Sequence, residues 1–254
     1  MSGAAAAGDG RAVAMVGFMG AGKSTAARSA ARALGGEPVD VDAVIEHRLG
    51  ATIGAIFARD GEAAFRAAEE RITLELLEAP SDGPRPVVAL GGGALGSAAV
   101  RDALRDHLTV WIDVDLDTAW RRCEGTARPL AADRDAFTAL YTARRPVYEQ
   151  AADVVVPQER AGEMGAVLAA LEGVPRTGVT VLWATSASGD YPAYIGPGLL
   201  SGPPFWPATV AGRRFVVTDY NVGRLYGEAL GRLDGRVTIM PGEQSKTIAH
   251  AEIV

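Results

Sequence analysis

A phosphate-binding motif stands near the start of the chain. Residues 17–24 read G-F-M-G-A-G-K-S and match the pattern G-x-x-x-x-G-K-[ST]. An apolar segment, 11–16, precedes it and an alanine-rich stretch, 23–34, follows, so we expect a strand before the loop and a helix after it. In that context Lys23 reaches the β- and γ-phosphates and Ser24 binds Mg²⁺. The motif predicts nucleoside triphosphate binding, and a glycine turn with a stray lysine is the alternative.

Lysine is rare in this chain. Of the 25 basic residues only Lys23 and Lys246 are lysines. An ammonium group is a compact point charge and a guanidinium group is a planar fork, so a position that keeps lysine in an arginine-rich chain is a candidate for a specific role. Chance is the alternative. Lys23 falls inside the phosphate-binding motif.

Two carboxylates follow the next apolar segment, at Asp40 and Asp42. Side chains two residues apart on a strand point the same way, and the carboxyl ends of parallel strands line the ligand crevice. Asp40 is placed to hold an Mg²⁺-bound water, and Asp42 to accept the proton of an attacking hydroxyl group. Equally, one of them is placed to cap the following helix.

Arginines and glycines mark the remaining candidate positions. Arg66 has Glu62 and Glu70 four residues away on either side. This spacing by itself favours an exposed salt-bridge ladder along one helix. Three consecutive glycines, 91–93, follow an apolar strand and suit close backbone approach to a ligand. The polar stretch 125–129, G-T-A-R-P, suits a mobile lid that carries Arg128. Arg144 and Arg145 form the last basic cluster, with a solvated helix face as the alternative.

Strand-like and helix-like segments alternate through residues 11–173, which predicts a mostly parallel sheet with helices on both faces. The expected strands are 11–16, 37–41, 87–90, 109–114 and 153–156, and the expected helices are 23–34, 42–49, 62–79, 97–108, 117–123, 135–150 and 162–172. We expect a flexible tail at 1–10 and a linker at 174–178. From 179 to 254 glycine and proline become dense, and a second α/β lobe begins but is incomplete, with strand-like runs VTVLWA, RFVVTD and RVTIM and a helix at 222–233.

Composition excludes several classes of protein. The net charge of −6 and the pI near 5.2 argue against a nucleic-acid partner. The chain lacks an apolar run of the ~20 residues that cross a bilayer, and its start lacks the basic region of a secretory signal. Cys123 is the only cysteine, so we expect a reducing, cytoplasmic compartment. Of the three histidines, His47, His107 and His250, none has metal-site spacing, and we expect His107 to interact with a helix dipole.

Seven motifs in register resemble the shikimate kinase family across residues 11–173. They are G-x-x-G-A-G-K-S-T at 17–25, D-V-D at 40–42, I-E-x-x-x-G at 45–50, I-x-x-I-F-x-x-x-G-E-x-x-F-R-x-x-E at 53–69, G-G-G-A at 91–94, R-P-L at 128–130 and R-x-P-V-Y at 144–148. The resemblance implies a P-loop kinase with a five-stranded parallel sheet. It also implies Mg²⁺- and ATP-dependent phosphorylation of the 3-hydroxyl of shikimate, in aromatic amino acid biosynthesis.

The resemblance also assigns roles to residues. It implies that ATP is bound by Gly20, Ala21, Gly22, Lys23, Ser24, Thr25, Arg122 and Arg128, with Ser24 and Asp40 at the metal. It implies that shikimate is bound by Asp42, Arg66, Gly91, Gly92, Gly93 and Arg144, with Arg145 as a competitor to Arg144. Lys23, Asp42 and Arg128 would be the catalytic residues. A planar guanidinium group suits a carboxylate ligand better than lysine does. The kinase domain is expected to be monomeric.

Residues 179–254 resemble the beginning of 3-dehydroquinate synthase, an enzyme that uses NAD and a divalent metal and would dimerise when complete. The matching segments are 191–198, 213–226 and 240–247. The likeness implies that the dinucleotide is contacted by Asp219, Asn221, Gly242, Glu243 and Lys246. The family's glycine-rich NAD loop and metal ligands are not in this sequence. We therefore expect a kinase fused to a synthase segment that does not catalyse by itself, while a generic α/β lobe is the alternative.

Two other functions compete with this interpretation. Another small-molecule P-loop kinase, such as a gluconate kinase, would share the phosphate loop but would not require both Arg66 and Arg144. A nucleotide-binding regulatory module that no longer catalyses would be expected to lack Asp42 or Arg128, and both are present.

Overall fold

The computed structural model describes residues 11–79, 83–126, 132–172, 174, 178–200, 212–245 and 247. The chain divides into two compact units, one up to Ile195 and one from Gly196 onward. The predicted tail 1–10, most of the linker 174–178 and the last residues of the chain lie outside the described residues.

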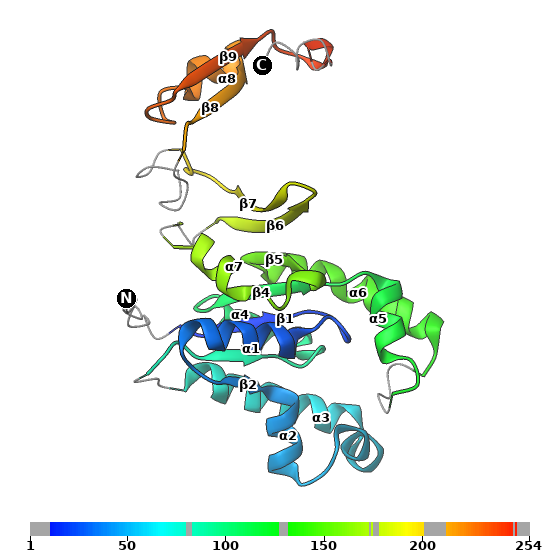
Figure 1. The fold of residues 1–254 in the computed structure, drawn as a ribbon. Helices are drawn as coiled ribbons and strands as arrows, with labels where there is room; N and C mark the ends of the chain where they lie inside the picture. The colour runs from blue at the N-terminus through cyan, green and yellow to red at the C-terminus, as the bar shows by residue number, and fades with distance from the viewer. Residues whose placement is uncertain are drawn as a thin grey trace. The chain divides into compact units, whose positions relative to one another are not determined.

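A seven-stranded sheet forms the centre of the first unit, in the order β2-β3-β1-β4-β5-β6-β7 (Figure 1). Its strands are β1 (Val13–Val16), β2 (Pro38–Asp40), β3 (Val87–Ala89), β4 (Leu108–Asp113), β5 (Val154–Pro157), β6 (Thr180–Ser186) and β7 (Gly189–Ile195). The first six strands are parallel, and β7 runs antiparallel to β6. The predicted α/β architecture is confirmed, but the predicted number of five strands is wrong.

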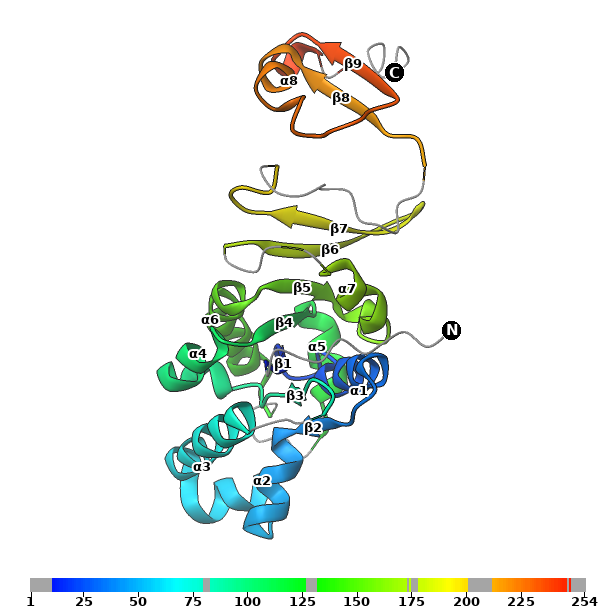
Figure 2. The same ribbon diagram turned by 90° about the vertical axis from the view of Figure 1, so that its left-hand side faces the viewer.

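Helices cover both faces of this sheet. They are α1 (Lys23–Leu34), α2 (Val41–Leu49), α3 (Ile53–Glu78), α4 (Ala98–Leu104), α5 (Leu116–Cys123), α6 (Arg134–Ala151) and α7 (Met164–Ala170), with short 3₁₀ turns η1 (Ala94–Gly96) and η3 (Gln158–Arg160). Figure 2 shows α1 and α7 on one side of the strands and α4 and α6 on the other. No helix in the described part of the chain combines the length and apolarity needed to cross a membrane.

The two extra strands are a hairpin that the sequence pattern assigned to the C-terminal lobe. Val181 and Leu182 of β6 pair with Val154 and Val155 of β5, so the hairpin continues the sheet of the first unit. Pairing satisfies backbone groups that an edge strand would leave open. The strand β7 escaped prediction because it contains Pro192, which interrupts a strand pattern but is tolerated at a sheet edge.

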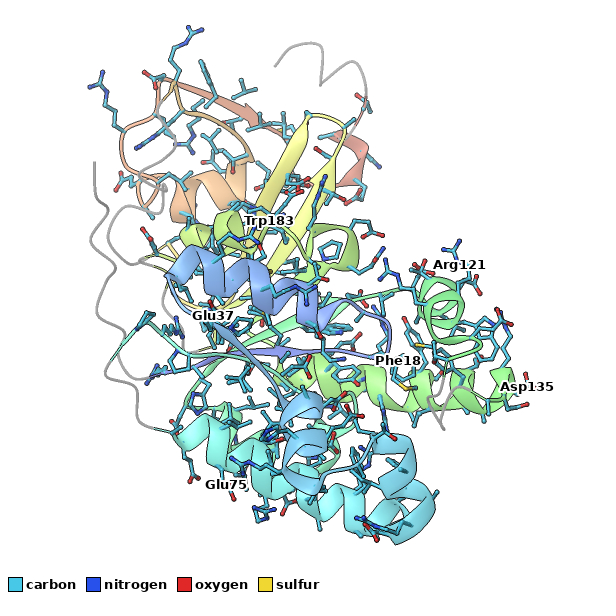
Figure 3. The ribbon with its side chains drawn as sticks, turned by 60° about the horizontal axis from the view of Figure 1, so that its bottom comes forward. Phe18, Glu37, Glu75, Arg121, Asp135 and Trp183 are labelled. Carbon is cyan, nitrogen blue, oxygen red and sulfur yellow. The ribbon has the colours of Figure 1, made fainter. Side chains whose placement is uncertain are left out.

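The central strand β1 is buried along its whole length, because its unbroken apolar sequence is covered on both faces. Phe18, which follows it, is also buried and packs edge-to-face against Phe137 and Tyr141 of α6, with ring centroids 5.0 and 5.2 Å apart (Figure 3). This aromatic contact fixes the start of the phosphate-binding loop against α6, the helix that also bears Arg144.

His107 does not serve as a cation at a helix end. Its Nδ1 accepts a hydrogen bond from the backbone N–H of Ala12 at 3.0 Å, just before β1. Burial lowers the pKa of His107; Asp106 opposes this decrease, and Arg85 and Arg11 add to it. Nδ1 acts as an acceptor, which requires an unprotonated nitrogen there, and α4 ends at Leu104, three residues before His107, so the predicted dipole interaction is wrong.

We expect this histidine to make folding stability depend on pH. Because its folded-state pKa lies below the unfolded value, its contribution is present above the unfolded pKa of about 6.5 and is lost as the pH falls through the folded pKa. The loss should be about 1 kcal/mol, the contribution of one hydrogen bond. Urea unfolding at several pH values measures it. His107→Asn should flatten the decline and exposed His47→Asn should not, whereas equal declines in wild type and His107→Asn would contradict the assignment.

The second unit contains a parallel strand pair, β8 (Phe215–Asp219) and β9 (Gly235–Ile239), joined through α8 (Tyr220–Tyr226) and followed by the short turn η4 (Glu243–Ser245). The helix predicted at 222–233 is thus shorter and begins earlier. Asp219 caps α8 by accepting a hydrogen bond from Val222 N at 2.8 Å. This unit is an α/β element, as the sequence pattern predicts.

Candidate active site

The phosphate-binding loop adopts a conformation that only glycine tolerates at two key positions. Gly17 has φ of 144°, and a Cβ atom there would lie 2.6 Å from the carbonyl oxygen of Ile112. Gly22 has φ of 96° and immediately precedes α1. The loop therefore wraps tightly around the N-terminus of α1, whose N–H groups provide positive potential for phosphate oxygens.

Lys23 and Ser24 start this helix. The Lys23 amino group donates to the carbonyl oxygens of Gly17 and Phe18 at 3.0 and 3.1 Å, so the loop holds its charge at the mouth of the site. Ser24 Oγ donates to Asp40 Oδ2 at 2.6 Å. Three predicted residues are thus brought together from β1–α1 and the end of β2.

Asp40 has two structural tasks at once. Its Oδ2 accepts from Ser24, and its Oδ1 accepts from the backbone N–H of Asp42 at 3.1 Å and of Ala43 at 3.4 Å. It is therefore the N-cap of α2, which answers the question of which aspartate caps the helix. The Asp42 carboxylate remains directed into the site.

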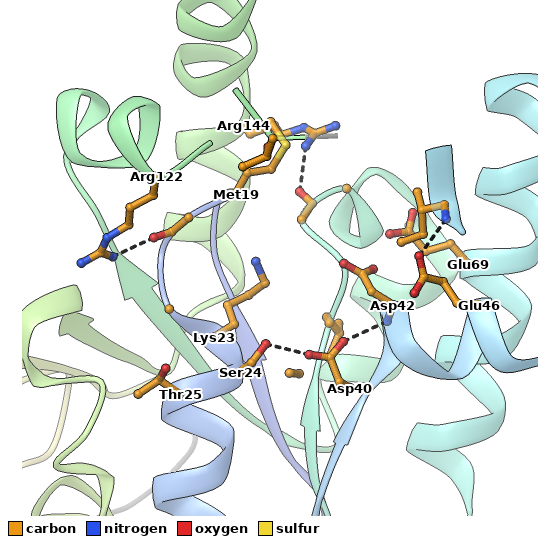
Figure 4. Close-up of a pocket in the computed structure, with 18 of the residues that line it drawn as sticks. Met19, Lys23, Ser24, Thr25, Asp40, Asp42, Glu46, Glu69, Arg122 and Arg144 are labelled. Atoms are coloured by element: carbon orange, nitrogen blue, oxygen red, sulfur yellow. Dashed lines mark hydrogen bonds between the residues drawn. The ribbon is translucent and has the colours of Figure 1, made fainter. Parts of the chain in front are cut away.

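These residues line a cavity of about 930 Å³ along the carboxyl ends of the strands. Lys23, Ser24 and Thr25 lie along one side, and Asp42 faces the same open space as Lys23 (Figure 4). The other end is lined by side chains from α3 and α6 and by the glycines after β3. The lining at that end includes Phe57, Phe65, Arg66, Glu69, Gly92, Gly93 and Arg144.

Arg66 is anchored by Glu69, the last residue of the motif at 53–69, to which the sequence analysis assigned no role. Its Nη1 donates to Glu69 Oε2 at 2.6 Å, while Nη2 lies 3.2 Å from Glu62 Oε1. The predicted ladder with Glu62 and Glu70 is therefore only half correct. Glu69 is 2% exposed. The available signal was its place on the apolar face of the helix, four residues after Phe65 and three before Ile72.

Burial raises the pKa of Glu69, Arg66 opposes the rise, and the nearby charge of Asp42 adds to it. Glu69 and Asp42 thus place two neighbouring carboxylates at this end of the cavity, and the cation Arg66 offsets their repulsion. The close packing also explains the glycines after β3. A Cβ atom on Gly91 would lie 2.1 Å from Glu69 Oε1, and one on Gly93 would lie 2.1 Å from Arg66 Nη1.

Arg144 enters the cavity from α6. Its Nη1 donates to the carbonyl oxygen of Gly92 at 2.9 Å, and Tyr148 donates to the same oxygen at 2.6 Å. Burial lowers the pKa of Arg144 and the positive charge of Arg66 adds to the decrease, whereas Tyr148 and the charge of Glu69 oppose it. Burial also raises the pKa of Tyr148 to about 12, so this phenol stays protonated. Among the described residues, Arg144 has no carboxylate within ion-pair distance.

Arg145 points elsewhere. It donates to both carboxylate oxygens of Asp113 at 2.8 and 3.1 Å and lies 5.0 Å from the ring centroid of Trp111. Of the two adjacent arginines, the structure therefore places Arg144 in the cavity and pairs Arg145 with β4.

Arg122 of α5 lies at the opposite end of the cavity, where its Nη1 donates to the carbonyl oxygen of Gly20 at 2.8 Å (Figure 4). Gln158, Glu159, Ala161 and Gly162 complete this end and were not predicted. Arg128, the predicted lid arginine, lies outside the described residues.

The arrangement has one end suited to a nucleoside triphosphate and another suited to an anion. The P-loop, Lys23 and the Ser24–Asp40 pair lie between them, and Asp42 faces the gap. With the strand order β2-β3-β1-β4-β5, these features define a P-loop kinase fold.

Comparison with known proteins identifies the family. The family model described as shikimate kinase matches residues 19–172. A shikimate kinase of Mycobacterium avium is 40% identical over 167 residues, covering 64% of this chain and 93% of that protein. One from Mycobacterium tuberculosis is 42% identical over 150 residues, covering 58% and 83%. The chain belongs to the shikimate kinase family.

Solved structures agree with this assignment. The shikimate kinase of Acinetobacter baumannii in complex with shikimate superposes with a TM-score of 0.59 at 30% identity, covering 65% of this chain and 96% of that one. The enzyme of Aquifex aeolicus gives a TM-score of 0.55 at 32% identity, covering 63% and 96%. The similarity therefore concerns the first unit.

Proposed function

We propose that this protein transfers the γ-phosphoryl group of ATP to the 3-hydroxyl group of shikimate. The observation that supports the proposal best is the half-buried cation Arg144. It faces the same cavity as the P-loop and Asp42 and lacks a carboxylate partner among the described residues. Glu69 acts on Arg144 only from beyond ion-pair distance, so an acceptor carboxylate would give this cation a direct partner, and shikimate carries one.

On the nucleotide side, the backbone N–H groups of the loop bind the phosphates and Lys23 exchanges its carbonyl partners for phosphate oxygens. Arg122 would lie beside the adenine base, at the nucleotide end of the cavity. Phosphoryl transfer demands little covalent chemistry from the protein, so positioning and neutralisation of negative charge provide most of the rate enhancement.

The Ser24 hydroxyl and the Asp40 carboxylate fit a magnesium ion, because they are two hard oxygen donors held 2.6 Å apart beside the loop. Ser24 would bind the ion directly and Asp40 through water. Held there, Mg²⁺ would supply positive charge that neutralises part of the negative charge of the nucleotide phosphates.

On the acceptor side, Arg66 and Arg144 would bind the carboxylate of shikimate. Asp42 would bind its hydroxyl groups, hold the nucleophile in line with the γ-phosphorus and accept its proton. Glu69 keeps Arg66 in place, and the Gly92 carbonyl keeps Arg144 in place. Arg128 is proposed to approach the transferring phosphoryl group from the lid.

A coupled assay of ADP release across three acceptors tests this proposal. We expect turnover with shikimate to exceed turnover with gluconate or with nucleoside monophosphates by at least 10²-fold. The reason is that a rigid ring holds its carboxylate and its hydroxyl group at a fixed separation, whereas gluconate carries both groups on an open chain and nucleoside monophosphates carry no carboxylate. Preference for gluconate would favour the rival kinase. ADP binding without turnover of any acceptor would favour a regulatory module.

Arg66→Ala should raise the KM for shikimate about tenfold or more, since a charge-assisted hydrogen bond contributes about 1.5–3 kcal/mol. The KM for ATP should change little. Arg71→Ala is the matched control, because Arg71 lies on the same helix and forms an exposed ion pair with Glu75 at 2.7 Å. An unchanged KM for shikimate in Arg66→Ala would mean that Arg66 only forms salt bridges on its own helix.

For residues 179–254, which include the hairpin β6–β7 and the whole second unit, we propose part of a 3-dehydroquinate synthase that contacts NAD. The parallel arrangement of β8 and β9 supports this, since Asp219 is in register with Ile239 and Gly242 follows shortly after. Asn221 and Glu243 lie beyond the same strand ends, and Lys246 lies outside the described residues. Weakened NAD binding by Asp219→Ala in ligand-observed NMR would support the contact. Formation of dehydroquinate by this chain with NAD and a divalent metal would contradict our expectation that the segment is not catalytic by itself.

A further inference from the structure

The nucleotide end of the cavity is closed by the loop that follows β5. Gln158, Glu159, Ala161 and Gly162 of this loop line the cavity. The loop has one anchor on the P-loop helix, where Ser29 Oγ donates to the carbonyl oxygen of Gly162 at 2.7 Å and accepts from Met164 N at 3.1 Å. Its conformation therefore determines the shape of the nucleotide end.

Arg160, in the middle of this loop, leaves the cavity and contacts the hairpin β6–β7. Its Nη2 donates to Asp190 Oδ1 at 3.1 Å, and its Nε lies 2.7 Å from Asp190 Oδ2. The side chain of Asp190 is only 14% exposed. Trp183 Nε1 donates to the same carboxylate at 3.3 Å. The cavity-lining segment 158–162 therefore has a second anchor, the contact of Arg160 with Asp190 of the hairpin.

The hairpin is itself firmly held within the first unit. Its strand β6 lies beside β5 and pairs with it (Figure 2). Trp183 is buried, and Tyr194 donates to the carbonyl oxygen of Ala170 at 2.7 Å. The hairpin nevertheless lies beyond residue 172, where the match to the family model ends. It therefore lies beyond the matched kinase region, in the segment that resembles the synthase, and yet reaches back to the nucleotide loop.

We propose that the hairpin β6–β7 is a working part of the kinase and that Asp190 is a positioning residue for nucleotide binding, acting through Arg160. This inference rests on the proposed function in that it places the nucleotide base beside residues 158–162. The Ser29 anchor remains when Asp190 is changed, so the expected effect is moderate rather than complete.

Calorimetric titration of the full chain with ADP, and separately with shikimate, tests the proposal. Asp190→Asn and Arg160→Gln should each raise the Kd for ADP about 3- to 10-fold, and the double variant should do no more than either alone, because both remove one contact. The Kd for shikimate should stay the same. Glu163→Gln is the matched control: it removes an ion pair at 3.0 Å that Arg160 makes within its own loop, without touching the hairpin.

An unchanged Kd for ADP in both single variants would overturn the proposal, as would equal weakening of ADP and shikimate binding. Should Asp190→Asn lose its cooperative thermal transition, the exchanged pair R160D/D190R decides the question: recovered ADP affinity supports the proposal and lost affinity rejects it. Because ADP binding is measured without an acceptor, a wild-type protein that binds ADP but does not phosphorylate shikimate would reject only the proposed acceptor.

Discussion

Lys23→Met is expected to lower kcat for shikimate phosphorylation by about 10³-fold or more, the effect of removing a preorganised group that stabilises transition-state charge. Methionine has nearly the same length as lysine but no charge. The Lys23 amino group is held between the carbonyl oxygens of Gly17 and Phe18, within the loop that receives the phosphates. Its loss leaves the negative charge that develops on the γ-phosphoryl group without its nearest side-chain cation from the loop.

Steady-state kinetics at saturating MgATP and shikimate, with the melting temperature as a check on folding, measure this effect. Arg105→Met is the matched control, because it removes one positive charge from a side chain that is 81% exposed. The control should keep kcat within about twofold, as surface substitutions usually do. A Lys23→Met protein that turns over at a near-normal rate would reject the role of Lys23.

The second large effect is expected for Asp42→Asn, which should lower kcat by about 10²- to 10⁴-fold, the range for loss of a general base. The amide preserves the shape of the side chain but cannot accept the proton of the shikimate hydroxyl group. Asp40, and not Asp42, caps α2, so the helix should remain intact. The KM for ATP should therefore change little.

Asp117→Asn provides the comparison for this variant, since Asp117 is an aspartate in the first turn of α5 whose side chain is 75% exposed. Burst kinetics and the pH dependence of kcat separate a chemical defect from slow product release. Normal single-turnover rates in Asp42→Asn would show that this carboxylate does not act on the nucleophile.

Several features of this protein could be predicted from local sequence. The P-loop is a contiguous motif whose glycines determine its backbone conformation and whose Lys23 and Ser24 start the following helix. Its position between β1 and α1 was therefore predictable. Asp40 and Asp42 were also located, although the predicted reason is wrong: β2 ends at Asp40, which caps α2, and Asp42 lies in the first turn of that helix rather than on the strand. Caps and periodicity also located α1 and α2 to within a residue.

The remaining decisions depend on packing between distant residues. Arg144 and Arg145 are equivalent in sequence, and only the carbonyl of Gly92, 52 residues away, and the carboxylate of Asp113, 32 residues away, separate them. Glu69 was missed because its burial depends on tertiary packing, in which the charge of Asp42 and the backbone of Gly91 come close to it, although its ion pair with Arg66 lies within one helix.

The hairpin β6–β7 shows the same limit at the level of the fold. The composition of the hairpin resembles that of the glycine- and proline-rich sequence after it. Its backbone hydrogen bonds, however, join it to β5. Local chemistry therefore fixed the phosphate-binding loop and the aspartate pair, whereas the choice of arginine, the burial of Glu69 and the extent of the sheet were decided by tertiary structure. These three features depend on contacts between backbone groups and charges that are far apart in the sequence. Local propensity does not determine such contacts.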